Sequence, residues 1–430
     1  MNVLIKDISK HVGEEITLKG WLYNKRSSGP LYFLELRDGY GWVQGVVAKK
    51  EVSPETWEAS EKVTQESSIE VVGKVAKHPK KENVFELQVT GIKILQLSHD
   101  YPIALKDHGP DFLMDNRHLW LRSKKQWAIL RIRDAVTTAI NEYLHQENFI
   151  RTDSPIFTPN ACEGTTTLFA VPYFDLGDAY LSQSGQLYIE AAIASVGRCY
   201  DFGPVFRAEK SKTKRHLTEF WMMDAEAAFV EHDENLKIQE GLVRHIVRYC
   251  LEHYKDELAI LERDVEKLKK ADAPFKRFTY DEAIKKLNEM GSDIKYGEDL
   301  GNDDEGLLTK DSEVPVFIEK WPKSIKPFYM KRSTENDNLV LNDDLIATDG
   351  GGEIIGGSQR EDDVQLLEER IKAEGLNQED YQWYLDLRKY GSVPHSGFGI
   401  GLERAVRWIS GTEHIRECIP FPRTISRLKP

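Results

Sequence analysis

The chain has 430 residues, of which 40% are hydrophobic and 30% charged, and its formal net charge is −13. This length suggests about two or three domains, and the apolar content excludes a wholly disordered chain. No apolar run approaches the roughly 18–20 residues of a membrane helix, so we expect no membrane association. The first residues show no signal-peptide pattern, and the four cysteines lie too far apart for a zinc site or a disulfide framework. We therefore expect a cytoplasmic protein, in which any nucleic-acid site is a local basic patch.

The first hundred residues contain five apolar or alternating runs, separated by turn sequences such as RSSGP and RDGYG. Such runs predict short strands, and five strands within residues 1–100 are typical of a small Greek-key barrel. Residues 101–114 contain Pro and Gly with little periodicity, which predicts a linker.

Residues 115–430 alternate between helical and strand patterns, which predicts a second, larger domain. Residues 129–143 carry apolar side chains at helical spacing. Residues 235–295 are strongly helical and charged, and we consider residues 235–310 a candidate helical insertion. The acidic stretch 303–305 within that segment predicts a solvated loop.

The segment GPVFRAEKSKTKRHLTEFWMMDAEAAF predicts two strands around a basic loop, with Arg207 and Glu209 on one face. The returning strand places four residues on one face: Phe220, Met222, Asp224 and Glu226. The loop between the strands carries five basic residues: Lys210, Lys212, Lys214, Arg215 and His216. Because guanidinium groups bind phosphate in a bidentate manner, this pattern favours a polyphosphate site. The alternative is a charged surface hairpin with cross-strand ion pairs.

Two glycine-rich segments follow. In GGGEIIGGSQRED, glycines around Glu353 permit a ligand to approach the backbone, and a carboxylate there suits Mg²⁺. A plain hairpin turn is the alternative. In SGFGIGLERAVRWISG, the glycine spacing does not match a dinucleotide-binding fingerprint. Arg404 lies in the first turn of the helix that follows, where it can reach a phosphate. The alternative is close helix–sheet packing with Arg404 as a surface cation.

One face of the predicted barrel carries Phe33, with Arg26 upstream and Gln44 on the next strand. An exposed aromatic ring among polar groups on a small barrel is typical of a surface that stacks single-stranded bases. The alternative is that Phe33 belongs to the barrel core.

Together these segments resemble the class II aminoacyl-tRNA synthetases of the aspartate, asparagine and lysine subgroup over essentially the whole chain. ENFIRTDSPIFTP is similar to motif 1 of that class, FRAEKSKTKRHLTEF to motif 2 and GFGIGLER to motif 3. The resemblance implies an α+β protein, with an N-terminal five-stranded barrel of the OB type before a catalytic domain of antiparallel sheet and helices. It also implies a homodimer with C₂ symmetry, since motif 1 packs subunits together in this class.

The resemblance further implies how ATP binds. Arg207 would hold the α-phosphate, Glu209 would meet the adenine amino group and Phe220 would stack under the adenine. His216 and Arg404 would hold the γ-phosphate end. Arg207 and Arg404 would thereby serve as the catalytic cations.

By the same resemblance, Glu353 would bind Mg²⁺ with Asp344, which we prefer over Asp343. Glu163 and Gln186 would hold the α-amino end of the amino acid. The barrel residues Arg26, Phe33 and Gln44 match the positions that bind the tRNA anticodon.

The three motifs do not tell which amino acid the enzyme would activate. Aspartyl enzymes place a lysine where this chain has Ile189 and a proline where it has Gly185. A substrate carboxamide needs one donor and one acceptor, which Arg360 and Asp224 would supply, whereas a carboxylate favours two cations. The pattern therefore favours activation of L-asparagine and transfer to tRNA-Asn.

Three alternatives stay open at this point. One is an aspartate-specific enzyme of the same subgroup. Another is an amide-forming relative that makes asparagine from aspartate, although such relatives lack the barrel. The third is a non-catalytic RNA-binding paralogue, although these usually lose the motif 2 or motif 3 arginine.

Overall fold

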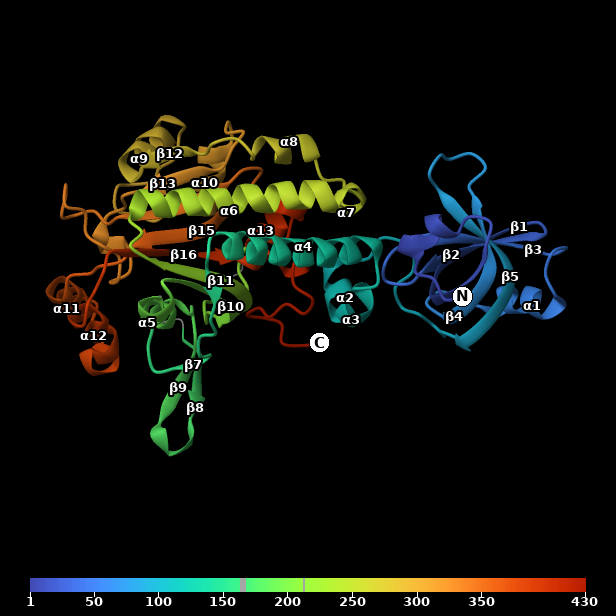
Figure 1. Cartoon of the computed structure of the whole chain (residues 1–430), viewed down its shortest axis with the longest axis horizontal. Coiled ribbons are helices and arrows are strands. Elements are labelled where there is room, and N and C mark those ends of the chain that lie inside the picture. The colour runs from blue at the N-terminus through green and yellow to red at the C-terminus, as the bar shows by residue number, and fades with distance from the viewer. Residues whose placement is uncertain (163–167, 212) are drawn as a thin grey trace. The chain divides into compact units, whose positions relative to one another are not determined.

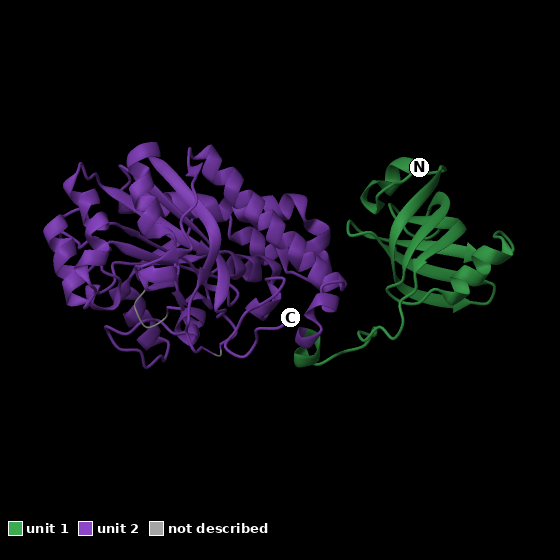
Figure 2. Ribbon diagram, turned by 90° about the horizontal axis from the view of Figure 1, so that it is seen from below, with its two compact units in different colours: residues 1–113 green, residues 114–430 purple. Residues whose placement is uncertain are grey.

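The computed structural model describes residues 1–162, 168–211 and 213–430 (Figure 1). The chain forms two compact units, residues 1–113 and 114–430 (Figure 2). The division falls within the predicted linker. No helix in the described ranges is both long enough and apolar enough to cross a membrane.

The first unit is a closed five-stranded barrel with strand order β1-β2-β3-β5-β4, which confirms the predicted architecture. Its strands are β1 (Glu15–Ser28), β2 (Leu31–Arg37), β3 (Trp42–Ala48), β4 (Ser68–Lys77) and β5 (Phe85–Gln96). A 3₁₀ helix (Ile5–His11) precedes the barrel, and helix α1 (Pro54–Lys62) lies between β3 and β4. Alternate side chains such as Leu34 and Leu36 of β2 fill the interior, and this leaves the other face of the strand for ligands.

The second unit is built on an eight-stranded sheet of order β12-β13-β14-β15-β16-β11-β10-β6. Its strands are β6 (Ile150–Arg151), β10 (Arg198–Phe206), β11 (Glu219–Ala228), β12 (Lys276–Thr279), β13 (Val316–Glu319), β14 (Asn342–Ala347), β15 (Gly352–Gln359) and β16 (His395–Gly401). The six central strands are antiparallel, as expected, but the edge strands β6 and β12 run parallel to their neighbours. The sheet is therefore mixed, within an α+β unit.

Helices cover this sheet. Figure 1 shows α4 (Lys124–Gln146) and α6 (His232–His253) running side by side across it, with α13 (Leu402–Ser410) behind. The side chain of Ser123 caps α4 by accepting a hydrogen bond from the backbone N–H of Gln126. The apolar stripe of α4, including Ile132 and Val136, enters the largest core cluster with residues of α6, α13 and the central strands.

The segment predicted as a helical insertion contains most of α6 and all of α7 (Lys255–Ile260), α8 (Val265–Lys270), α9 (Tyr280–Glu289) and α10 (Asn302–Thr309). It also contains β12, which extends the main sheet, and α6 lies in the main core. The segment is therefore part of the layered fold. The predicted solvated loop at 303–305 is wrong, because these residues form the first turn of α10 and Glu305 is buried.

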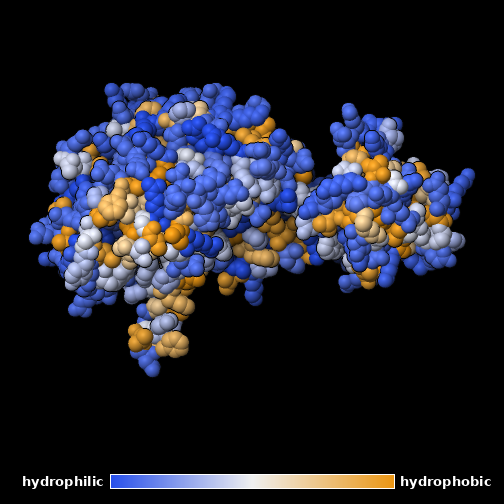
Figure 3. Space-filling model, in the orientation of Figure 1, coloured by the Kyte–Doolittle hydropathy of each residue, from blue (hydrophilic) through white to orange (hydrophobic). Residues whose placement is uncertain are grey.

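A small second sheet, β7 (Phe157–Thr158), β9 (Asp178–Leu181) and β8 (Ala170–Pro172), precedes α5 (Gln186–Val196). Figure 3 shows apolar side chains on the arm that this sheet forms. The 3₁₀ turn between β8 and β9 exposes Phe174 and Leu176. The remaining helices are α2 (Pro110–Asp115), α3 (Arg117–Trp120), α11 (Val364–Ala373), α12 (Gln382–Lys389) and short 3₁₀ turns at Lys323–Ile325, Gln378–Tyr381 and Ile415–Glu417.

Candidate functional site

A pocket of about 300 Å³ lies in the second unit, over the middle of the large sheet. Its lining brings together ten residues singled out from the sequence: Gln186, Arg207, Glu209, His216, Phe220, Asp224, Asp344, Glu353, Arg360 and Arg404. These residues come from β11, β14, β15, α5, α13 and the segments that follow β10 and β15. Glu163 and Lys212 lie outside the described residues.

Three glycines of β16 face acidic or large side chains of β11 across the antiparallel pair. Gly397 pairs with Glu226, Gly399 with Asp224 and Gly401 with Met222. A Cβ on Gly397 would lie 1.9 Å from Oε2 of Glu226, and one on Gly399 would lie 2.5 Å from Oδ1 of Asp224. The GFGIG run therefore leaves room for the acidic side chains of the neighbouring strand.

Arg207 follows β10 directly and lies at one end of the pocket. Its guanidinium carbon is 5.5 Å from the centroid of the Phe220 ring, which projects from β11. Its buried Nε has no hydrogen-bond partner among the described residues. Since an unpaired buried donor costs about 1–3 kcal/mol, this nitrogen indicates that the pocket is built to receive an anion.

The basic loop after Arg207 is tied to the rest of the unit. Arg215 forms an ion pair with Glu305 of α10, and the backbone N–H of Glu353 donates to the same carboxylate at 3.1 Å. Nδ1 of His216 lies 3.2 Å from the hydroxyl of Ser211. Burial, helped by the charge of Arg404, lowers the pKa of His216 below its usual value. The sequence did not indicate that Glu305 is part of this site, since its partner is distant in the chain.

Arg404 lies in the first turn of α13 and contacts Glu353. Its Nη1 is 3.1 Å from Oε2 of Glu353 and donates to the backbone carbonyl of the same residue at 3.0 Å. Burial raises the pKa of Glu353, but the charges of Arg404 and Lys326 outweigh it and hold the pKa below its usual value. Glu353 is therefore an ionised carboxylate beside Arg404.

The two candidate metal-binding residues, Asp343 and Asp344, are neighbours on β14, so their side chains point to opposite faces of the sheet. Asp344 lines the pocket, where Oδ2 accepts a 2.7 Å hydrogen bond from Lys326. Asp343 points to the opposite side of β14, where it is fully buried 3.9 Å from His232. Lys326, which also lies over the ring of Trp321, comes from an irregular segment without a sequence pattern, and sequence reasoning missed it.

The remaining oxygens of the two pocket acids converge. A Cβ on Gly356 would lie 3.6 Å from Oε1 of Glu353 and 3.7 Å from Oδ1 of Asp344, so both oxygens face the same small gap. Among the described residues, no cluster of three or more His, Cys, Asp or Glu side chains would hold a metal by itself. Two carboxylates that share an ion with substrate phosphates fit the usual coordination of Mg²⁺.

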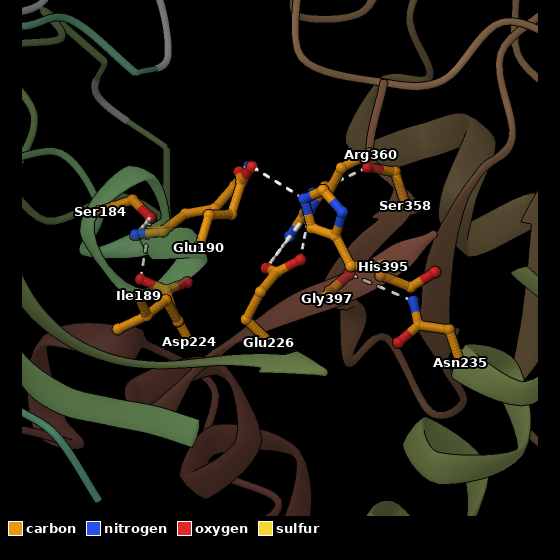
Figure 4. A network of polar contacts seen from close by, with 12 residues as sticks. Ser184, Ile189, Glu190, Asp224, Glu226, Asn235, Ser358, Arg360, His395 and Gly397 are labelled. Atoms are coloured by element: carbon orange, nitrogen blue, oxygen red, sulfur yellow. Dashed lines mark hydrogen bonds and ion pairs between the residues drawn. The ribbon is translucent and has the colours of Figure 1, made fainter. Parts of the chain in front are cut away.

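The other end of the pocket holds a buried network of charged groups (Figure 4). Arg360 makes a bidentate ion pair with Glu226, at 3.0 Å from Nε and 2.9 Å from Nη2, and donates from Nη1 to Ser358 at 2.7 Å. Asp224 accepts from the hydroxyl of Ser184 at 2.8 Å and from the backbone N–H of Gly185 at 3.0 Å.

Behind this network lies Glu190 of α5, which is fully buried. It accepts hydrogen bonds from Arg388 at 2.7 Å and from Nε2 of Gln186 at 3.0 Å, and His395 lies 3.2 Å away. Burial raises the pKa of Glu190, but Arg388 and His395 outweigh it and hold the pKa far below its usual value. Because Glu190 binds the amide nitrogen of Gln186, the amide oxygen is the acceptor that an α-amino group needs.

Ile189 does not line this end of the pocket. It packs with Ile193 and Cys199 in a small apolar cluster between α5 and β10.

The first unit carries a separate groove on the outer face of the barrel. Its lining residues are Asn24, Arg26, Phe33, Glu35, Trp42, Val43 and Gln44. The guanidinium of Arg26 lies 4.7 Å from the centroid of the Phe33 ring and donates to Oε1 of Gln44 at 2.9 Å. The structure thus brings the three predicted anticodon-binding residues together, and Phe33 lies outside the barrel core.

Fold and site together define a nucleotide-dependent ligase with an attached oligonucleotide-binding barrel. Residues 109–425 match the family of tRNA synthetases class II (D, K and N), and residues 16–95 match the OB-fold nucleic acid binding domain. The chain therefore belongs to the class II aminoacyl-tRNA synthetases of the D, K and N family, and it is a ligase.

Comparison with solved structures shows which members of this family the chain is similar to. Asparaginyl-tRNA synthetase from Pyrococcus horikoshii, complexed with asparaginyl-adenylate, is 42% identical with a TM-score of 0.96 over 100% of both chains. Its counterpart from Entamoeba histolytica, in complex with the same adenylate, is 34% identical with a TM-score of 0.90, again over 100% of both chains. Aspartyl-tRNA synthetase from Entamoeba histolytica is 28% identical with a TM-score of 0.84, covering 100% of this chain and 93% of that one.

Proposed function

We propose that this protein activates L-asparagine with ATP and then esterifies tRNA-Asn. The observation that carries the proposal is the charge arrangement at the amino-acid end of the pocket. Glu226 neutralises Arg360, whereas neutral donors of Ser184 and Gly185 hold Asp224. In the proposed site, the carboxylate of Asp224 accepts hydrogen bonds from a carboxamide NH₂ group, whereas it would repel a carboxylate. Asparaginyl enzymes among the most similar solved structures support this choice.

In the first step, the carboxylate of asparagine attacks the α-phosphorus of ATP and pyrophosphate leaves. No protein nucleophile takes part in this step. Arg207 would stabilise the charge that develops on the α-phosphate, with Phe220 under the adenine and Glu209 at its amino group. Arg404 and His216 would hold the γ-phosphate end. Positioning and fixed positive charge are then the source of the rate enhancement.

In the second step, a hydroxyl of the terminal adenosine of tRNA attacks the carbonyl carbon of the adenylate, and AMP leaves. Gln186, which Glu190 orients, would hold the α-amino group of the asparaginyl moiety throughout. Glu163 is assigned to the same end by the family resemblance and lies outside the described residues.

Glu353 and Asp344 would hold Mg²⁺, with Lys326 and Arg404 on their outer oxygens. The ion supplies positive charge to the phosphate oxygens when ATP is bound. The positions of these carboxylates around Gly356 support the assignment.

The proposal also covers the tRNA-binding site, the oligomeric state and the cellular compartment. The barrel groove would bind the anticodon of tRNA-Asn by stacking on Phe33, with Arg26 and Gln44 at the base edges. The protein would act as a C₂ homodimer, supported by apolar side chains that motif 1 exposes, namely Ile150, Ile156 and Phe157. It would act in the cytoplasm, supported by four buried cysteines that form no disulfide.

The experiment that tests the proposal is ATP–pyrophosphate exchange without tRNA, comparing asparagine with aspartate at equal concentrations. Exchange that depends on asparagine supports the proposal. Exchange with aspartate alone would overturn it and favour the aspartate-specific or amide-forming alternatives. A protein that binds no ATP in calorimetry would be the non-catalytic alternative.

A further inference from the structure

The turn before α5 is packed against β10 more closely than a side chain at position 185 would allow. A Cβ on Gly185 would lie 1.6 Å from Oδ2 of Asp201, 2.6 Å from its Cγ and 2.7 Å from the hydroxyl oxygen of Ser154. The backbone of Gly185 has φ −84° and ψ −4°, which any residue adopts without strain. Glycine is therefore required here by space and not by backbone conformation.

Asp201 is the side chain that occupies this space. It lies on β10 directly opposite Asp224 of β11 and is 8% exposed. It does not line the pocket. Its carboxyl group fills the volume beside the Cα of Gly185. It therefore lies behind the turn that donates hydrogen bonds to Asp224.

The close approach has a direct consequence at the pocket. With the turn in this position, the N–H of Gly185 and the hydroxyl of Ser184 both reach Oδ2 of Asp224, while Oδ1 lies on the side of Gly399. A turn held farther from the sheet would move both donors away from Asp224.

We propose that Gly185 and Asp201 are positioning residues that set amide selectivity by fixing the orientation of Asp224. The pair acts through packing: Asp201 fills the space that only glycine leaves, and the turn then delivers its N–H to Asp224. This inference rests on the proposed asparagine activation and adds two residues that touch no substrate.

A double-mutant cycle tests the steric part, with the KM for asparagine in pyrophosphate exchange as the readout. Gly185→Ala is expected to raise this KM at least about tenfold and to leave the KM for ATP unchanged, because the turn must move away from Asp201. In the Asp201→Ala background the same substitution is expected to raise it by less than about threefold, since the Cβ then has room and the small hydroxyl of Ser154 rotates aside.

Asp201→Asn is the matched control, because a carboxamide keeps the volume of the carboxyl group and removes its charge. In the Asp201→Asn background, Gly185→Ala is expected to retain its full effect. Equal effects of Gly185→Ala in all three backgrounds would overturn the inference. Relief by Asp201→Asn as large as by Asp201→Ala would also overturn it, since charge and not volume would then be responsible.

Gly185→Pro in the Asp201→Ala background isolates the donor, because proline has no N–H. We expect it to raise the KM for asparagine about tenfold above Gly185→Ala in that background, as loss of a hydrogen bond to a charged group implies. Equal KM values would overturn the role of the N–H. If the wild type activates aspartate and not asparagine, the proposed function fails, whatever coupling the cycle measures.

Discussion

At the scale of single residues, the cations at the phosphate end of the pocket are the groups that we expect to stabilise the transition state. Arg207 has a buried Nε without a partner among the described residues, and it lies beside the ring of Phe220. Removing one such charge-stabilising donor typically costs about 3–4 kcal/mol of transition-state stabilisation.

We therefore expect Arg207→Ala to lower the rate of asparagine-dependent pyrophosphate exchange about a hundred- to a thousandfold. Arg198→Ala is the matched control, because Arg198 is a cation at the start of β10, the strand that Arg207 follows, and pairs with Glu234 at 3.1 Å, away from the pocket. It is expected to exchange at nearly the wild-type rate. Normal exchange by Arg207→Ala would contradict the assignment of this residue.

Asp201 makes stability depend on pH. Burial, together with the charge of the opposing Asp224 and of Asp153, raises its pKa to about 7. A carboxyl group whose pKa is raised by folding binds more protons in the folded state. Its favourable contribution is present below the unfolded pKa near 4 and is lost as the pH rises through about 7.

We therefore expect the free energy of unfolding of the wild type to fall, relative to that of Asp201→Asn, by up to about 4 kcal/mol between pH 4 and pH 8. Urea unfolding of both proteins at several pH values measures this difference. Parallel pH profiles of the two proteins would show that Asp201 does not titrate in this range.

Other residues show which assignments needed the structure. The choice of Asp344 over Asp343 agrees with their placement, because neighbouring residues of β14 point to opposite faces and only Asp344 lines the pocket. The sequence did not indicate Glu305 or Lys326. Glu305 contributes to the pocket through Arg215, 90 residues away, and Lys326 through Asp344, 18 residues away.

At the level of elements, α10 anchors the loop that follows β10. The ion pair between Glu305 and Arg215 joins them, and Glu305 also accepts from the backbone of Glu353. The loop should therefore lose its preferred position over ATP when this link is broken.

We expect Glu305→Gln to raise the KM for ATP at least about tenfold, in line with the loss of one charge-assisted hydrogen bond, and to leave the KM for asparagine unchanged. Initial-rate measurements with varied ATP test this. Asp303→Asn, an exposed change in the same helical turn, is the control. An equal effect of both substitutions would argue against a specific link.

The barrel groove offers a second test at this scale. Base stacking on an aromatic ring is typically worth about 1–3 kcal/mol, so Phe33→Ala should lower kcat/KM for tRNA charging by about five- to 150-fold. Pyrophosphate exchange without tRNA should remain unchanged, because the barrel and the catalytic unit have separate cores. Tyr40→Ala, which removes an exposed ring outside the groove, is the control. Equal charging by the two variants would contradict the assignment of the groove.

At the scale of the whole molecule, the catalytic unit exposes apolar side chains on and after the edge strand β6. Ile150 is 51% exposed and Phe157 is 48% exposed. Self-complementary burial of such a patch around a two-fold axis is the usual form of a homodimer.

We therefore expect light scattering to give about twice the chain mass of 49.4 kDa. The double variant Ile150→Ser, Phe157→Ser should shift the protein toward the monomer. Leu105→Ser, at an exposed apolar side chain of the first unit, should not change the mass. A monomeric wild type would contradict the proposed assembly.

The sequence by itself determined the fold class, the family and most of the charged residues of the pocket. Local patterns go far here, because alternation predicts the barrel strands, motifs 2 and 3 carry Arg207 and Arg404, and the glycine-rich segment 350–362 carries Glu353. These residues lie at the ends of regular elements, where sequence spacing translates directly into position.

Only the tertiary structure decided how the charges are paired. Arg360 with Glu226, Arg388 with Glu190 and Lys326 with Asp344 are pairs separated by 134, 198 and 18 residues. The roles of the glycines in GFGIG and of Gly185 also depend on which side chain lies opposite. The physical reason is that ion pairing and close packing are set by strand register and by the approach of distant segments, which local sequence patterns do not encode.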